Sequence, residues 1–337
     1  MLRWHQDSAP VSPALFRGQV IAWITEGLID LSVSRPASRL HWGVTVPGDQ
    51  DQTIYVWIDA LCNYLTVAGY PDLRGHWPPT VQVLGKDILK FHSIYWPAML
   101  MSLGLDLPQR LLVHCHWTVD NVKMSKSLGN VVDPNTLVDK YSTDGVRYFL
   151  LREGVPHSDG NFSESSMVQL LNLELADTLG NLLNRCCSKG VNKQDSIPKY
   201  PSEYRGESQL AQDLEYQMIH AKDLVGDSYD QFNFYQGCVH IMSMLRLANQ
   251  FVQEQQPWTL KAESERDKLH WVLSLTFECL RISGILLQPI VPDLASRLLD
   301  KLSVEPGLRG WSEATPMTIA SDSTLRPGKT VLFNKIR

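Results

Sequence analysis

A short basic segment near the middle of the chain, Lys123-Met-Ser-Lys-Ser-Leu-Gly-Asn, has the residue types of a polyphosphate site. Two lysines three positions apart flank a small hydroxyl residue, and flexible ammonium groups beside exposed backbone N–H groups can neutralise a triphosphate and a pyrophosphate leaving group. The segment is not a Walker loop, because no G-x-x-x-x-G-K-[ST] occurs. A K-x-x-K pair by itself would indicate only a solvated basic turn. The full string Lys-Met-Ser-Lys-Ser is a far more specific signal of a functional site.

Two groups of residues could bind an apolar ligand. Residues 53–59 are rich in β-branched and aromatic side chains, which predicts a strand that places Trp57 and Asp59 on one face. A buried Trp ordinarily packs in a core. Ile88 and His92 are four apart and share one face of a predicted helix, where a lone His is more often a hydrogen-bonded core group. Asp87 can cap that helix.

Two polar residues and one aromatic residue further along could read nucleic acid bases. Asn181 and Arg185 lie four apart beside an apolar helical stripe, and they offer an amide and a planar fork to unstacked base edges. In most helices such a pair is simply a polar face. Trp258 follows Gln-Pro after a predicted helix, where the proline would fix the turn that presents the ring.

Metal ligation is disfavoured. None of the six cysteines forms a Cys-x-x-Cys pair, and Cys186 and Cys187 are sequence neighbours that seldom bridge. His114-Cys115-His116 would place its middle side chain opposite the other two in a strand. We therefore expect reduced thiols packed as small apolar groups and no protein-bound zinc.

The elements that position these residues follow from the patterning. Residues 15–30 and 88–101 predict helices, and 80–85 and 110–116 predict buried strands. A strand, a helix and a strand in that order predict a parallel βαβ unit, so the first region is α/β.

The pattern of apolar residues changes from about residue 165 onward. Apolar residues recur at helical spacing over 165–187, 210–229, 235–256 and 263–287, with breaks at Gly226, Gln256-Pro257 and Gln288-Pro289. Four helices with short links predict an all-α bundle. The tail from residue 304 is predicted as loop, with a terminal strand at 330–333 as an alternative.

Size and charge limit the function classes. The chain has 337 residues, 44% of them hydrophobic, and a net charge of −5, which suggests about two domains and excludes intrinsic disorder. No uninterrupted apolar run reaches the ~20 residues of a membrane span. Residues 1–164 carry 13 basic and 16 acidic side chains, and 165–337 carry 18 and 20. Neither part is a basic arm, so any RNA contact must come from local patches.

Lys123–Ser127 resembles the KMSKS signature of class I aminoacyl-tRNA synthetases. Segments 42–49, 55–64 and 85–98 are similar to methionyl-tRNA synthetases, and the Asp-Ala-Leu-x-Asn-Tyr form is closest to vertebrate mitochondrial members. The resemblance covers essentially the whole chain but only the C-terminal part of such an enzyme. It implies an α/β fold: the C-terminal half of a Rossmann-type catalytic domain followed by an all-α anticodon-binding bundle.

The resemblance also implies residue roles. Lys126 would stabilise the transition state of amino-acid activation and Lys123 would assist at the phosphates. The ATP-binding residues would be Lys123, Met124, Ser125, Lys126 and Ser127; the methionine-binding residues Trp57, Ala60, Tyr64, Asp87, Ile88 and His92; and the anticodon-binding residues Asn181, Arg185 and Trp258. The implied partners are methionine, ATP with Mg²⁺ and tRNA(Met), for a monomer of the mitochondrial matrix with no membrane contact.

The expected domain boundaries are a partial catalytic domain at 1–135, a stem-contact connector at 136–164, an anticodon-binding domain at 165–303 and a tail at 304–337. No two of the ten histidines lie three residues apart, so the family's His-x-Gly-His-like motif is absent, and we expect this chain alone to lack half of its ATP site. The first residues resemble neither a secretory signal nor a transit peptide.

Three residues depart from the family pattern. Leu61 stands where proline is common, and Cys115 and Asn121 stand where glycine is common, although Asn tolerates positive φ. Two functions stay open from the sequence. One is methionine–tRNA ligase, and the other is a non-catalytic module that binds the tRNA anticodon through the bundle alone.

Overall fold

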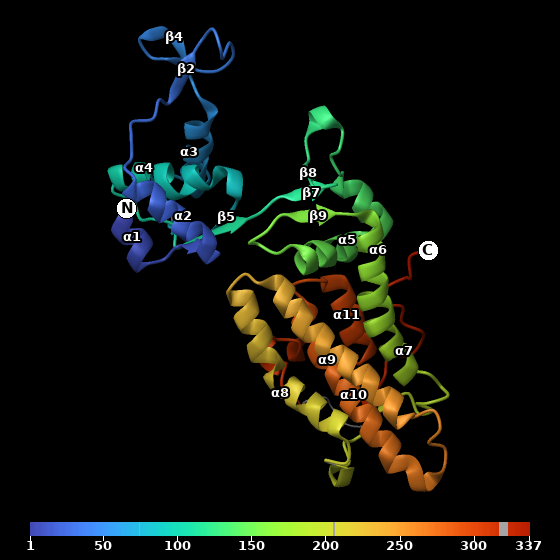
Figure 1. Cartoon of the computed structure of the whole chain (residues 1–337). Coiled ribbons are helices and arrows are strands. Elements are labelled where there is room, and N and C mark those ends of the chain that lie inside the picture. Colours follow the sequence, from blue (N-terminus) through green and yellow to red (C-terminus); the bar gives the residue numbers. More distant parts are fainter. Residues whose placement is uncertain (74, 205, 317–322) are drawn as a thin grey trace. The chain divides into compact units, whose positions relative to one another are not determined.

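The computed structural model describes residues 1–73, 75–204, 206–316 and 323–337. The chain divides into an N-terminal unit, residues 1–116 with 156–159, and a C-terminal unit, residues 117–155 with 160–337 (Figure 1). This division falls earlier in the chain than the expected boundary at residue 135. It places the Lys123–Ser127 segment in the same unit as the helical bundle.

The N-terminal unit is built on a three-stranded parallel sheet in the order β1 (Val11–Ser12), β6 (Arg110–His114), β5 (Val81–Gly85). The predicted parallel pairing of the two longer strands is therefore confirmed. The crossover between them holds a 3-10 turn η1 (Lys86–Ile88), a π-helical turn η2 (Phe91–Tyr95) and helix α4 (Trp96–Ser102).

Two helices precede the sheet's long strands, α1 (Leu2–Asp7) and α2 (Ala14–Thr25), the second ending five residues before the predicted limit. The buried core joins them to the sheet because alternate strand residues face the helices. Its buried members are Val11, Phe16, Val20, Leu84, Leu89, Ile94, Leu111 and Val113.

The predicted strand at 53–59 is wrong beyond its second residue. An antiparallel sheet in the order β2 (Ser34–Pro36), β4 (Asp49–Ile54), β3 (Thr45–Val46) ends there, and helix α3 (Val56–Ala68) follows at once. The local β-branched and aromatic residues favour a strand, but Leu61 and Leu65, four apart, bury against Trp96 and Leu100 of the next helix. Tertiary packing of a helical stripe thus overrides local propensity.

The C-terminal unit begins with a small sheet in the order β8 (Val122–Lys123), β7 (Trp117–Val119), β9 (Gly160–Phe162). A 3-10 turn η3 (Lys126–Leu128) and helix α5 (Pro134–Glu153) lie between β8 and β9 in the chain. The carboxylate of Asp133 caps α5 by accepting from the backbone N–H groups of Asn135 and Thr136.

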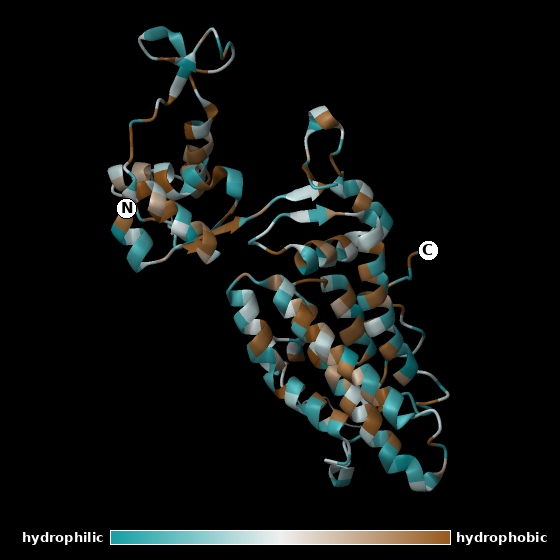
Figure 2. Cartoon of the chain, viewed as in Figure 1, coloured by the Kyte–Doolittle hydropathy of each residue, from teal (hydrophilic) through white to brown (hydrophobic). Residues whose placement is uncertain are grey.

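The bundle confirms the four predicted helices, but the predicted break at Gly226 is wrong because α8 continues through that residue to Asp230. The first is a continuous helical path of α6 (Glu164–Leu170), the π-helical η4 (Leu171–Gly180) and α7 (Asn181–Cys186); then follow α8 (Gln209–Asp230), α9 (Phe234–Gln255), and the turn η6 (Glu263–Glu265) with α10 (Arg266–Leu287). A fifth helix, α11 (Pro292–Lys301), was not predicted. Hydrophobic and hydrophilic residues interleave along these helices (Figure 2), as expected for helices that share one core.

Helix α10 is the central element of the bundle. Together with η6 it is long and apolar enough to cross a membrane by length and composition, but 89% of its most apolar window is buried inside the protein. The described part of the tail carries a strand β11 (Ser323–Thr324), which pairs with β10 (Ser196–Ile197), and no strand at 330–333. The terminal-strand alternative is therefore wrong.

Candidate functional site

Helix α3 places the three predicted pocket residues of this segment on one face. Trp57, Ala60 and Tyr64 are three and four positions apart, which is the spacing of a helix face. The Trp57 ring centroid lies 5.5 Å from that of Phe91 and 5.7 Å from that of Tyr95, both on η2. The correction from strand to helix thus gathers these side chains, and it removes Asp59 from their face.

Tyr64 and His92 form the polar centre of this aromatic group. The Tyr64 hydroxyl lies 2.9 Å from Nε2 of His92, and Nδ1 of His92 lies 3.0 Å from the carbonyl oxygen of Ile88. Because a carbonyl only accepts, Nδ1 carries the proton, and Nε2 of the neutral ring accepts from Tyr64. Burial lowers the pKa of His92 and so favours this neutral form.

The aromatic group also contains an unsatisfied donor. The buried Nε1 of Trp57 has no hydrogen-bond partner among the described residues, and a buried polar atom without a partner is costly unless something else supplies one. A ligand here would meet aromatic rings, one indole N–H and a hydroxyl–imidazole pair. That lining suits a thioether, whose sulfur–ring contacts are worth ~0.3–1.5 kcal/mol each.

Asp87 does not cap a helix as one interpretation of the sequence had it. Its Oδ1 lies 3.3 Å from Nε2 of His116, and the residue before η1 is Gly85. Nearby, Lys86 donates to both carboxylate oxygens of Asp159 at 2.7 and 2.8 Å, and the backbone N–H of His116 donates to Asp159 at 2.8 Å. The Lys86 hydrogen bond is the main cause that lowers the pKa of Asp159.

This charged cluster was missed by sequence reasoning. Asp159 lies far from Lys86 in the chain, so no local spacing connects the two. Only the return of residues 156–159 to the N-terminal unit brings them together.

The Lys123–Ser127 segment forms an ordered loop in the C-terminal unit. The side chain of Asn130 bridges it: Oδ1 accepts from the backbone N–H of Ser125 at 2.9 Å, and Nδ2 donates to the carbonyl of Lys123 at 3.3 Å. The Ser125 hydroxyl accepts from the N–H of Leu128 and so caps η3. Lys123 and Lys126 are both exposed, so their ammonium groups can reach an anionic ligand.

The turn before this loop explains one family departure. Asp120 and Asn121 both adopt positive φ, of 52° and 60°, a region that Asn enters more readily than most residues. The side chain of Asn161 holds the turn by accepting from the N–H of Asn121 at 2.9 Å. Asn121 therefore adopts the positive φ that the turn needs, at a position where glycine is common in the family.

Two of the three predicted base-reading residues, Arg185 in α7 and Trp258 in the segment after α9, lie in contact. The Arg185 guanidinium lies 5.2 Å from the Trp258 ring centroid, and its Nη2 donates to the Gln253 side chain at 3.2 Å. Asn181 is exposed, and its amide donates to Asp177 at 3.1 Å. Trp258 is 36% exposed, so part of its ring is open to a stacking partner.

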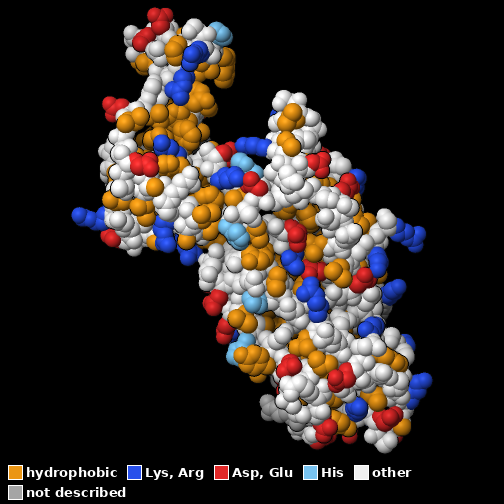
Figure 3. Space-filling view, in the orientation of Figure 1, with side chains coloured by type: hydrophobic (Ala, Val, Ile, Leu, Met, Phe, Trp, Pro, Cys, Tyr) orange, Lys and Arg blue, Asp and Glu red, His pale blue; other side chains and the backbone are white. Residues whose placement is uncertain are grey.

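Surface charge of both signs is mixed on the face shown in Figure 3.

The six cysteines are free thiols, three of them buried; Cys62 is exposed, and Cys115 and Cys187 are half-buried. The expectation of six packed thiols was therefore wrong for Cys62.

Comparison with known proteins places the chain among synthetases. Residues 1–187 match the family model "tRNA synthetases class I (M)", and residues 197–337 match "Anticodon binding domain of methionyl tRNA ligase". The mitochondrial methionine–tRNA ligase of Homo sapiens is 49% identical over 327 residues, which are 92% of this chain and 55% of that protein. The Xenopus laevis protein of the same name is 43% identical over 350 residues, with 100% of this chain and 62% of that protein covered.

Solved structures give the same result. Mycobacterium tuberculosis methionyl-tRNA synthetase in complex with methionyl-adenylate has a TM-score of 0.87 and 36% identity, with 98% of this chain and 65% of that chain covered. The chain thus spans about half to two thirds of the length of these proteins.

Proposed function

The chain belongs to the methionyl-tRNA synthetases of class I, and from that premise we propose that it contributes to methionine–tRNA ligase activity in mitochondrial translation. The reaction converts methionine and ATP to methionyl-adenylate and pyrophosphate, and then transfers the methionyl group to tRNA(Met). The observation that carries this proposal is the aromatic group around Tyr64 and His92, because its lining matches the side chain of methionine. The mitochondrial relatives support a location in the mitochondrial matrix.

In this proposal the N-terminal unit selects the amino acid. Trp57, Tyr64 and the Ile88–His92 turn surround the thioether, Ala60 leaves room beside it, and the neutral His92 ring avoids burying an uncompensated charge. Asp87 is exposed and carries the only negative charge among the proposed methionine-binding residues, so it suits the substrate's ammonium group. The Tyr64–His92 and His92–Ile88 hydrogen bonds already hold these groups in place, so little entropy is lost when the ligand binds.

The signature loop, Lys123–Ser127, acts on the phosphates of ATP. A carboxylate oxygen of methionine attacks the α-phosphorus, the bond from that phosphorus to the bridging oxygen of the β-phosphate breaks, and pyrophosphate leaves with the electron pair. Lys126 and Lys123 stabilise the charge that develops on the phosphate oxygens, with Met124, Ser125 and Ser127 shaping the loop. Mg²⁺ would come with ATP, because it binds mainly through substrate phosphates. A ribose hydroxyl of tRNA then attacks the methionyl carbonyl, and AMP leaves.

The bundle reads the tRNA. An anticodon base stacks on Trp258, which contributes about 1–3 kcal/mol in such contacts. The Arg185 fork and the Asn181 amide meet the edges of neighbouring bases. The second candidate function, a tRNA-binding module without catalysis, is favoured by the position of all three residues in the C-terminal unit, which contains its own core.

Two assays separate the candidates. We expect no methionine-dependent ATP–pyrophosphate exchange from this chain alone, because the sequence has no His-x-Gly-His-like motif; robust exchange would contradict that expectation. An RNA hairpin with a CAU anticodon should bind more tightly than one with a changed anticodon, and Trp258→Ala should remove the difference. Equal binding of both hairpins by the unaltered chain would contradict anticodon reading in either candidate.

A further inference from the structure

A pocket of the bundle lies between the two chain segments that follow Arg185 and Trp258. Its walls are the segment 190–198, which follows α7, and the segment 260–266, which follows α9, and its floor is the start of α10. Trp258 precedes the first wall residue, Leu260, by two positions. A strand of nucleic acid stacked on Trp258 would therefore meet a segment that leads directly into the pocket wall.

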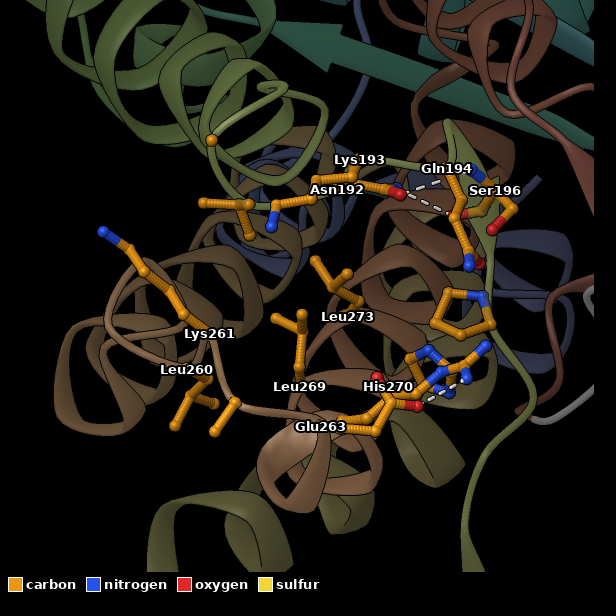
Figure 4. Close-up of a pocket in the computed structure, with 15 residues that line it drawn as sticks. Asn192, Lys193, Gln194, Ser196, Leu260, Lys261, Glu263, Leu269, His270 and Leu273 are labelled. Carbon is orange, nitrogen blue, oxygen red and sulfur yellow. Dashed lines mark hydrogen bonds and ion pairs between the residues drawn. The ribbon is translucent and has the colours of Figure 1, made fainter.

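The pocket has an apolar floor and polar walls. Leu269 and Leu273 project from α10 toward the segment 192–196, with Leu260 beside them (Figure 4). Gln194, Ser196 and His270 add hydrogen-bonding groups to the lining, shown on one side of the same view. The cavity volume is about 190 Å³, and a cavity of roughly 150 Å³ holds benzene. A flat heteroaromatic ring thus finds room, an apolar surface and partners for its edge.

The rim is cationic. Lys193 and Lys261 stand on opposite walls, both exposed, and within the described residues neither ammonium group has a hydrogen-bond or ion-pair partner. Arg266 is already engaged, because its Nη1 donates to Glu263 at 2.9 Å. Two uncommitted ammonium groups at the mouth of an apolar pocket suit a ligand with a phosphate outside and a ring inside.

Both walls are held in place before any ligand binds. The Asn192 side chain donates to the carbonyl of Ser196 at 2.7 Å and accepts from its N–H at 3.3 Å. On the other wall, a carboxylate oxygen of Glu265 accepts from the N–H groups of Lys261 and Ala262, each at 3.0 Å. Pre-organised walls reduce the entropy cost of ligand binding.

We propose that this pocket binds one unstacked nucleotide of the tRNA anticodon loop, outside the triplet that Trp258 and Arg185 read. The base lies on Leu269 and Leu273, and Lys193 and Lys261 bind the flanking phosphates. The inference rests on the proposed RNA-binding function, and it adds a binding subsite that provides affinity through shape and charge.

The test uses the full chain and a CAU-anticodon hairpin, with affinity measured by fluorescence anisotropy over a range of salt concentrations. The double variant Lys193→Ala/Lys261→Ala should weaken binding roughly ten-fold and reduce the salt slope by about 1.4, since two single-strand phosphate contacts are lost. The matched control, Lys199→Ala/Lys268→Ala, removes the same charge outside the pocket and should leave both quantities unchanged.

A plug variant tests the base. Leu269→Trp fills the floor and should weaken binding, with folding checked by its unfolding transition. A hairpin with one abasic loop position outside the triplet should bind the unaltered chain roughly ten-fold more weakly, because the apolar contact of the base with Leu269 and Leu273 is lost. It should bind the plug variant no more weakly than the intact hairpin does.

The outcomes separate this proposal from the proposed function. If Trp258→Ala weakens hairpin binding but the Lys193/Lys261 variant matches its control and the plug has no effect, the pocket proposal fails and anticodon reading stands. If AMP alone binds as tightly as the hairpin and Leu269→Trp removes that AMP binding, the occupant is a free nucleotide and the proposal is overturned. If the unaltered chain does not bind the hairpin, the RNA-binding function itself fails, and the pocket proposal fails with it.

Discussion

The Tyr64 hydroxyl and Nε2 of His92 lie 2.9 Å apart, joining α3 to the π-helical turn of the crossover. Because the other ring nitrogen of His92 donates to Ile88, the direction of this hydrogen bond is fixed. The pair therefore orients both side chains in the proposed methionine pocket without a charge.

Tyr64→Phe should weaken methionine binding roughly three- to ten-fold, because it removes one hydrogen bond worth about 0.5–1.5 kcal/mol and leaves Nε2 of His92 without its partner. Calorimetric titration of the chain with methionine measures the change. Tyr95→Phe is the matched control, since within the described residues the Tyr95 hydroxyl makes no hydrogen bond while its ring contacts Trp57. Equal losses in the two variants would show that the Tyr64 hydroxyl has no special role.

Acid should destabilise the fold through His92. Burial lowers its pKa in the folded state, so below the ordinary value of about 6.5 the unfolded chain binds a proton that the folded chain does not. The unfolding free energy is thus highest above that pH and falls as the pH drops toward the lowered pKa. His92→Gln should make the pH dependence shallower in urea unfolding between pH 7 and 5, and an unchanged slope would contradict the assignment. Burial also lowers the pKa of His5. The contribution of His5 to the pH dependence should therefore be the same in the unaltered chain and in the His92→Gln variant.

Arg185→Lys should weaken binding of the CAU hairpin roughly five- to ten-fold. Lysine keeps the charge but lacks the planar fork that contacts both Gln253 and the Trp258 ring. Fluorescence anisotropy measures the affinity, and Lys189→Arg, at an exposed lysine nearby in the chain, is the control. Full retention of affinity by Arg185→Lys would mean that charge alone matters at this position.

Asn130→Ala should loosen the signature loop. The Asn130 side chain bridges Ser125 and Lys123, so its loss should speed amide hydrogen exchange at Ser125 and Leu128 and weaken ATP binding. Methionine affinity should not change, because the methionine residues belong to the other unit. Exchange measured by mass spectrometry, with Asn135→Ala as the control, tests this; unchanged exchange would assign the order of the loop to its backbone.

Glu174→Gln should lower the free energy of unfolding by about 3–5 kcal/mol, since it removes one partner of a buried charged network. Glu174 is 1% exposed and accepts from Tyr148 at 2.6 Å, Arg152 at 3.2 Å and Arg246 at 2.5 Å. Urea unfolding measures the cost. Glu263→Gln, in an exposed ion pair with Arg266, should cost at most about 1 kcal/mol. Similar costs for both variants would contradict the argument from burial.

The sequence alone determined much of this protein. The spacing of apolar residues predicted four bundle helices and the parallel pair of strands, because those periods reflect which faces are buried. The Lys-Met-Ser-Lys-Ser string and the flanking segments identified the family. These signals are local, so a single stretch of chain contains each one.

Tertiary structure decided what local signals could not. Residues 56–59 have strand propensity, yet they form α3 because Leu61 and Leu65 bury against Trp96 and Leu100. The Lys86–Asp159 pair and the Arg185–Trp258 contact join residues far apart in sequence. The spacing of residues along the chain does not predict such pairs. The pocket between residues 190–198 and 260–266 likewise exists only where two loops meet the start of α10. These contacts depend on packing between segments that are distant in the sequence, so only the tertiary structure determines them.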